Sequence, residues 1–132
     1  MGLYADTLLG SGQPVPAMEL LDQGLATMHA ASRTYFFQSE LHRLRARGLL
    51  QLGGSDAVDE ARSALDESLV VAERQGSSAL ALRTLIDRLE LELGENDQAA
   101  TPWRDRLGLV LTVYDDQAPT PDADRARELL DA

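Results

Sequence analysis

Apolar residues recur with helical spacing along almost the whole chain. Between positions 34 and 52, for example, Leu41, Leu44, Leu49 and Leu52 lie three to five residues apart, and polar side chains occupy the opposite stripe. This spacing predicts amphipathic helices that bury one face in a core and expose the other. Alternating apolar and polar residues, which would indicate half-buried strands, are almost absent. The pattern therefore predicts an all-α fold.

Side chains that favour helix ends and turns separate the periodic segments. Clusters of glycine, proline, serine and asparagine mark short turns, and Ser77 or Ser78 can cap the helix that follows one of them. Thr120 followed by Pro121 is typical of the start of a last, short helix. Together these signals predict seven helices, at about 3–10, 16–31, 34–52, 56–75, 78–93, 99–115 and 121–131.

The helical pattern repeats with a period of about 40 residues. Gly12, Gly53 and Gly94 each close a leucine-rich helix, and neighbouring members of this set lie 41 residues apart. Two helices in each such period are typical of stacked helical repeats, in which each hairpin buries its apolar face against its neighbours. The sequence thus predicts a single repeat domain over 1–132, with hairpins at about 1–31, 34–75 and 78–115 and a capping helix at 121–131.

The first predicted helix is shorter than its counterparts in the later repeats. Only residues 1–11 precede Gly12, whereas the two later first helices run about 16 to 19 residues before their glycine. We therefore expect the chain to begin inside a repeat and to be a C-terminal fragment of a longer protein. An incomplete repeat exposes apolar surface, so an upstream segment, or a second copy in a homodimer, would complete it. Alternatively, the short first helix caps the stack as it stands.

Composition and charge narrow the available chemistry. The 132 residues are 44% hydrophobic and 26% charged, as in a folded globular domain. Cysteine and lysine are both absent, which excludes disulfides, thiolate metal sites, cysteine nucleophiles and reactions that need a lysine amine. Twenty-two acidic residues give a net charge of −10, which repels nucleic-acid phosphates. With no signal peptide or membrane span evident, we expect a cytoplasmic protein that contacts neither nucleic acid nor membrane.

Three segments resemble a known family. Residues 40–53 contain ELHRLRA followed by two leucines and a glycine, and they look like the helix opening of tetratricopeptide-like repeats in large bacterial regulators. Residues 64–89, with AERQGSS and then LALR, resemble the next stretch, and residues 114–131 resemble the C-terminal ending. The family comprises the C-terminal arms of ATPase-bearing adenylate-cyclase-like proteins and of LuxR-type or AfsR-type transcriptional regulators. The resemblance covers about residues 8–132.

This resemblance implies a fold and a general role. It implies tetratricopeptide-like antiparallel helix hairpins stacked in a short right-handed superhelix. It also implies a scaffold or sensor arm without catalysis, because the ATPase, cyclase and DNA-binding residues of the family lie in other domains. The chain departs from the family at Leu91 and Leu93, where a tryptophan is usual, and at Ala46, which replaces the repeat glycine. Both departures concern packing.

The residues themselves offer little catalytic chemistry. His29 and His42 are the only histidines, and neither has a second histidine at helical spacing. The adjacent pair Asp115 and Asp116 does not share a helix face, so acid–base pairing is not expected. The Gly-Ser-Gly run at 10–12 lacks the strand that a nucleotide-binding loop needs and is interpreted as a turn. We expect no enzyme activity, no metal and no cofactor.

A polar stripe is the main candidate for a binding site. If Gly53 and Gly94 follow the first helices of tetratricopeptide-type repeats, the concave groove is lined by Glu40, Arg43, Arg47, Gln51, Thr84, Arg88 and Glu92. Three of these are arginines, which can bind a carboxylate or an acidic peptide through forked hydrogen bonds. The alternative is a solvated face with ion pairs from Glu40 to Arg43 and from Arg88 to Glu92.

Aromatic residues offer a second candidate surface. Tyr35, Phe36 and Phe37 lie together at the start of one predicted helix. They pack between repeats or, alternatively, form a partner-binding ledge, since exposed aromatic side chains anchor interfaces. Trp103 is expected in the core or at the edge of the stack.

Two functions follow as hypotheses. The first is a non-enzymatic interaction module of a bacterial signalling or transcriptional regulator, which binds a protein segment or another domain of that regulator in its groove. The alternative is a small-ligand-sensing arm, in which a metabolite in the groove biases the activity of the larger protein.

Overall fold

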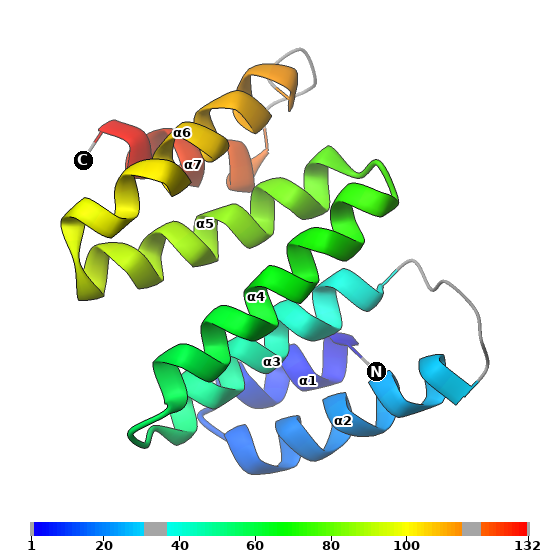
Figure 1. Cartoon of the computed structure of the whole chain (residues 1–132). Helices are drawn as coiled ribbons and strands as arrows, with labels where there is room; N and C mark the ends of the chain where they lie inside the picture. Colours follow the sequence, from blue (N-terminus) through cyan, green and yellow to red (C-terminus); the bar gives the residue numbers. More distant parts are fainter. Residues whose placement is uncertain (1, 31–36, 115–119, 132) are drawn as a thin grey trace. The chain divides into compact units, whose positions relative to one another are not determined.

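The computed structural model describes residues 2–30, 37–114 and 120–131, and all regular structure within these ranges is α-helical (Figure 1). The all-α fold and the number of helices predicted from the pattern are thereby confirmed for the described residues. In chain order the seven helices are α1 (Gly2–Gly10), α2 (Pro14–Ala30), α3 (Gln38–Leu52), α4 (Ala57–Arg74), α5 (Ser78–Glu95), α6 (Asp97–Tyr114) and α7 (Pro121–Asp131).

The helix boundaries lie within a few residues of those predicted, with two informative differences. α3 begins at Gln38, and its N-cap residue, Phe37, makes no side-chain capping hydrogen bond. Residues 34–36, which the sequence also predicts to be helical, lie outside the described ranges. α5 continues through Gly94 to Glu95, where Asn96 in an extended conformation ends it. A glycine inside a helix costs only about 0.5–1 kcal/mol relative to alanine, so it does not by itself end a well-packed helix.

Glycines in the left-handed region close the first two turns that the repeat predicts. Gly12, between α1 and α2, has a φ of 74°, and Gly53, between α3 and α4, has a φ of 75°. Residues with a Cβ are strained at such angles, which explains why glycine stands at both turns. Gly76 has the same role between α4 and α5, with a φ of 65°. Gly12 and Gly53 thus occupy equivalent turns, whereas Gly94, the third glycine of the 41-residue series, lies inside α5.

The chain divides into two compact units, 1–71 and 72–132, and the boundary falls inside α4. In the first unit, α2 packs against α1 and α3, and α1 also packs against α3. In the second unit, α5 packs against α6 and α7, and α6 also packs against α7. Each unit therefore contains a set of helices that bury apolar faces against one another.

Leucines from different helices form the core of the first unit. Leu9 of α1, Leu21 of α2, Leu44 of α3 and Leu65 of α4 are all buried. Burial of this kind removes apolar surface from water at roughly 25 cal/mol per Å² and is the main source of helical stability in proteins.

Two buried serines join α3 to α4 in this unit. The Ser39 hydroxyl donates to the Ser68 carbonyl oxygen at 2.9 Å, and the Ser68 hydroxyl donates to the Ser39 carbonyl oxygen at 2.8 Å. The two hydroxyl oxygens lie 3.0 Å apart. These reciprocal bonds satisfy polar atoms that would otherwise destabilise the core, and the short side chains allow the two helices to approach closely.

α3 also passes close to α1 and α2, at Gly48. A Cβ atom at this position would lie 2.5 Å from the sulfur of Met18 and 3.6 Å from a methyl carbon of Leu9. Only a glycine leaves room for these neighbours as they stand. Gly108, inside α6, has no such neighbour within 4 Å of a Cβ atom.

The second unit buries α5 most deeply. Leu82, Leu85 and Leu89 of α5 are almost completely buried, together with Leu107 of α6 and Ala126 of α7. Two of the N-caps expected from the sequence are present: the Ser77 hydroxyl accepts from the Leu80 N–H, and the Thr120 hydroxyl accepts from the Ala123 N–H. These caps satisfy N–H groups that the first turns of α5 and α7 leave without helical partners.

The two helical glycines should respond in opposite ways to substitution. Gly48→Val places a side chain against Met18 and Leu9, and overpacking of this kind typically destabilises a protein by about 1–3 kcal/mol. Gly108→Ala meets no neighbour and lowers the conformational freedom of the unfolded chain, which should stabilise it by about 0.5–1 kcal/mol. Urea unfolding followed by far-ultraviolet circular dichroism measures both effects as midpoint shifts at unchanged slope. Equal shifts of the same sign would contradict the close approach at Gly48.

Candidate functional site

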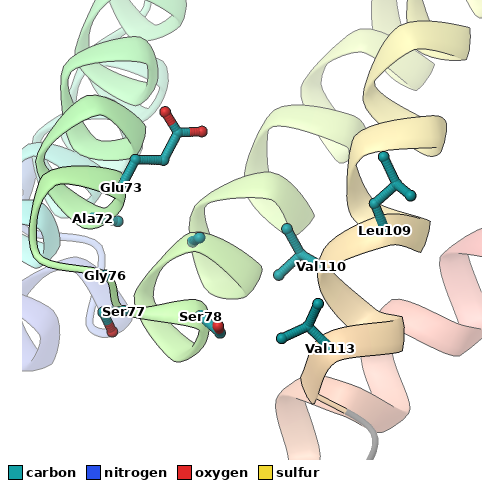
Figure 2. Close-up of a pocket in the computed structure, with 9 residues that line it drawn as sticks. Ala72, Glu73, Gly76, Ser77, Ser78, Leu109, Val110 and Val113 are labelled. Atoms are coloured by element: carbon teal, nitrogen blue, oxygen red, sulfur yellow. The ribbon is translucent and has the colours of Figure 1, made fainter.

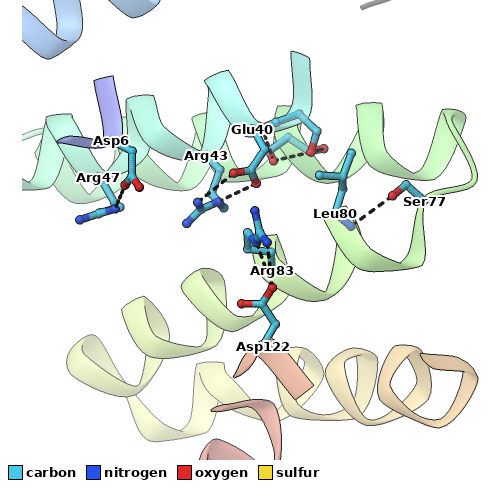
Figure 3. Close-up of polar contacts among 10 residues, drawn as sticks. Asp6, Glu40, Arg43, Arg47, Ser77, Leu80, Arg83 and Asp122 are labelled. Carbon is cyan, nitrogen blue, oxygen red and sulfur yellow. Dashed lines mark hydrogen bonds and ion pairs between the residues drawn. The ribbon is translucent and has the colours of Figure 1, made fainter. Parts of the chain in front are cut away.

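The polar stripe on α3 is held by hydrogen bonds within the first unit (Figure 3). Arg43 donates through Nε and Nη2 to the two carboxylate oxygens of Glu40, at 2.9 and 3.0 Å. Arg47 donates to Asp6 of α1 at 2.7 Å, and the Gln51 side-chain amide donates to the Leu9 carbonyl oxygen at 3.0 Å. The predicted pair from Glu40 to Arg43 is therefore present, and the C-terminal half of the stripe binds α1.

The remaining predicted groove residues lie on α5, in the second unit. Thr84, Arg88 and Glu92 are buried, with exposed fractions of 1%, 8% and 3%. Arg88 donates through Nε to Glu92 at 3.2 Å, so the expected ion pair is present, inside the protein. Convergence of Arg88 with the α3 arginines on one ligand stays a prediction.

Two guanidinium groups lie over the Trp103 ring in the second unit. The Cζ atom of Arg88 is 4.2 Å from the ring centroid, and that of Arg106 is 5.2 Å away. Arg106 in turn donates to Glu73 at 2.8 Å. Both contacts are cation–π interactions, which gain strength where the charge is shielded from water. Trp103, the only tryptophan of the chain, thus links α6 to α5 through the buried Arg88.

Ion pairs also join α5 to α7. Arg83 of α5 contacts Asp122 at 3.0 Å (Figure 3). Arg125 of α7 contacts Glu90 of α5 at 2.9 Å and Glu128 at 3.2 Å. The hydrogen bond that Arg125 donates to Glu90, followed by the one that it donates to Glu128, raises the pKa of the Arg125 guanidinium above its ordinary value. The Arg83–Asp122 pair is partly buried, whereas the two Arg125 pairs are exposed and therefore contribute little to stability.

An apolar cavity of about 340 Å³ opens on the second unit (Figure 2). One wall is α6, and the other is the end of α4, the turn after it and the start of α5. Two of the α6 residues are strongly exposed, Leu109 at 71% and Val113 at 65%. The lining residues are Ala72, Glu73, Gly76, Ser77, Ser78, Ala81, Leu109, Val110 and Val113.

Sequence reasoning did not identify this cavity. The signal was available, because α6 carries Leu109, Val110 and Val113 in addition to the stripe of Trp103, Leu107, Leu111 and Tyr114 that predicts its core face. A helix with more apolar residues than one core face requires either has a second packed face or exposes an apolar surface.

A second, more polar cavity of about 410 Å³ lies in the first unit. Its lining comes from three helices: Leu25 of α2, His42 and Arg45 of α3, and Glu60, Ser63, Ala64 and Glu67 of α4. Arg45 also donates to Asp22 at 3.1 Å. The cavity therefore presents both positive and negative groups to any small molecule that enters it.

Several predicted residues lie outside the described structure. Tyr35, Phe36, Asp115 and Asp116 belong to the ranges that are not described. Phe37, the last residue of the aromatic run, is exposed. Within residues 2–30, 37–114 and 120–131, no three histidine or carboxylate side chains are grouped so that they could hold a metal ion. Among the described helices, none combines the length and apolar character that crossing a membrane requires.

Comparison of the chain with protein-family models, with curated proteins and with solved structures gives no match.

The two arginines beside Trp103 should contribute very differently to stability. Arg88→Met removes one partner of a buried ion pair, and losses of this kind reach about 3–5 kcal/mol. Arg106→Met removes an exposed ion pair and the weaker cation–π contact, so the free energy of unfolding should fall by at most about 1.5 kcal/mol. Urea unfolding followed by Trp103 fluorescence reports both variants. Losses of equal size would show that burial of the Arg88–Glu92 pair does not govern the stability of this unit.

Proposed function

We propose that the chain is a non-enzymatic, tetratricopeptide-like repeat scaffold that mediates protein–protein or interdomain contacts in a bacterial signalling or transcriptional regulator. The observation that carries the proposal is the exposed apolar wall of α6, where Leu109 and Val113 border the cavity in the second unit. Exposed aliphatic patches next to a cavity are typical of surfaces that bind another protein.

The repeat character supports this assignment. Gly12 and Gly53 have nearly the same φ and stand 41 residues apart, each in the turn between two consecutive helices. The period is longer than the roughly 34 residues of a standard tetratricopeptide repeat, so the likeness concerns the pairing of helices rather than a strict consensus. Repeat scaffolds of this kind use stacked helices to present extended binding surfaces.

The predicted polar groove and the apolar wall of α6 differ in how far their side chains are exposed to a partner. On the α5 part of the predicted polar groove, Arg88 and Glu92 are buried, and on α3 the side chains of Arg47 and Gln51 bind α1. The α6 wall, by contrast, exposes most of the Leu109 and Val113 side chains. The proposal therefore favours the apolar surface of the second unit over the arginine stripe.

A specific observation also favours the alternative, a small-ligand-sensing arm. The polar cavity of the first unit has a volume of about 410 Å³, which falls in the usual range of ligand sites, and it offers His42 and Arg45 opposite Glu60 and Glu67. Such a set is complementary to a small zwitterionic molecule. Under this alternative, the ligand would bind in the first unit and not at the α6 surface of the second unit.

Binding measurements separate the two functions. Proteins captured by the tagged chain from an extract of the source organism are identified, purified and titrated against the chain by calorimetry. We expect at least one to bind at a defined stoichiometry, and an unrelated helical protein of similar negative charge controls for charge attraction. If no purified protein binds, while an amino acid or a related metabolite raises the melting temperature by several degrees, the scaffold proposal is wrong and the sensing arm replaces it.

A further inference from the structure

The apolar cavity of the second unit has the form of a short groove with one projecting wall. Leu109 and Val113 are four residues apart and therefore lie on the same side of α6, with Val110 beside them. Small residues, Ala72, Gly76 and Ala81, form the opposite side. Because the residues opposite this aliphatic ridge are small, the groove between them has room for large apolar side chains of a partner. A helix with apolar residues at i, i+4 and i+7 provides them in the required spacing.

Carboxylates flank this groove. Glu73 lines its rim, with a side chain that is 57% exposed and is paired with Arg106. Asp105 is exposed one turn before Leu109 on the same side of α6. The chain as a whole carries a net charge of −10. Arg106 balances the charge of Glu73 at the rim, so the excess negative charge near the groove comes from Asp105 and from the net charge of the chain. This excess complements a partner with basic side chains beside an apolar stripe.

Charge also argues against a second copy of the chain in this groove. Two copies would each bring a charge of −10 to the complex. Like charges placed together at an interface disfavour the complex. A basic partner gains from the same carboxylates that repel a second copy.

We propose that this groove, formed by α6 and by the turn from α4 to α5, docks a basic amphipathic helix of a partner protein. The docked helix places its apolar stripe against Leu109, Val110 and Val113, and its lysines or arginines lie toward Asp105. The inference rests on the scaffold function proposed above and adds the surface and the chemistry of the partner. Its charged contacts lie at the rim, where they affect partner choice and association rate more than affinity.

A pair of designed helical peptides tests the charge of the partner. Both have about 18 residues, long enough to form a helix, and carry leucines at i, i+4, i+7 and i+11. One bears lysines on its flanks and the other bears glutamates. Fluorescence anisotropy of the labelled peptides should show binding of the basic peptide, weakened by added salt, and binding of the acidic peptide at least about tenfold weaker. Equal binding of the two, or failure of the basic peptide to bind, would overturn the proposal.

Substitutions in the ridge test the location. Leu109→Glu and Val113→Glu change exposed side chains, so folding should persist, and circular dichroism verifies it. Docking in the groove predicts at least about tenfold weaker binding of the basic peptide. Simple attraction to an acidic surface predicts the opposite, because each substitution adds a negative charge. Leu52→Glu, at an exposed leucine of α3 in the first unit, is the matched control and should bind as the unaltered chain does.

Two further outcomes separate this proposal from the scaffold function. If a purified natural partner binds the Leu109→Glu/Val113→Glu variant as tightly as the unaltered chain, the scaffold function stands and the groove is not its site. Light scattering over a range of concentrations examines self-association. A dimer that this double variant abolishes would assign the groove to a second copy and overturn the choice of a basic partner.

Discussion

The constraint on which the structure depends is that each helix must bury an apolar face against other helices, because the chain has no cysteine for a disulfide and no described cluster that could bind a metal. Leu9, Leu21 and Leu44 meet this constraint in the first unit, and Leu82, Leu89 and Leu107 meet it in the second. Hydrogen bonds such as those between Ser39 and Ser68 refine the packing rather than replace it. Against this background, Leu109 and Val113 of α6 are the most exposed of the large apolar side chains in the described residues.

Arginine supplies every basic side chain of the protein, and its planar guanidinium links helices that apolar packing alone would leave free to slide. Arg47 reaches Asp6, Arg83 reaches Asp122 and Arg125 reaches Glu90, so each of these pairs joins two different helices. Their exposure limits the stability that each contributes. Arg88 differs, because it is buried between its ion-pair partner Glu92 and the ring of Trp103. The same residue type therefore aligns helices at the surface and forms part of the interior.

Helix number, approximate boundaries and the caps at Ser77 and Thr120 could be predicted, because each depends on local residue preferences and on spacing along one helix. The polar stripe could be located on α3 and α5, but not the burial of Arg88, since a pattern on one helix does not reveal which neighbours cover it. The excess of apolar residues on α6 was visible in the sequence, but the cavity beside Leu109 and Val113 was not, since its second wall includes the turn after α4. Gly94 shows the limit of repeat spacing, because α5 continues through it to Glu95 and ends only at Asn96, which is extended.

The close approach at Gly48 has a consequence for how such a chain can change over evolutionary time. A side chain at position 48 would occupy the space of the Met18 sulfur, so the volumes at these two positions are not independent. A lineage that gains alanine or serine at 48 must move the Met18 side chain or exchange it for a shorter one, and a shorter residue at 18 lowers the cost of the change at 48. The effect of a substitution at either position therefore depends on the residue that occupies the other.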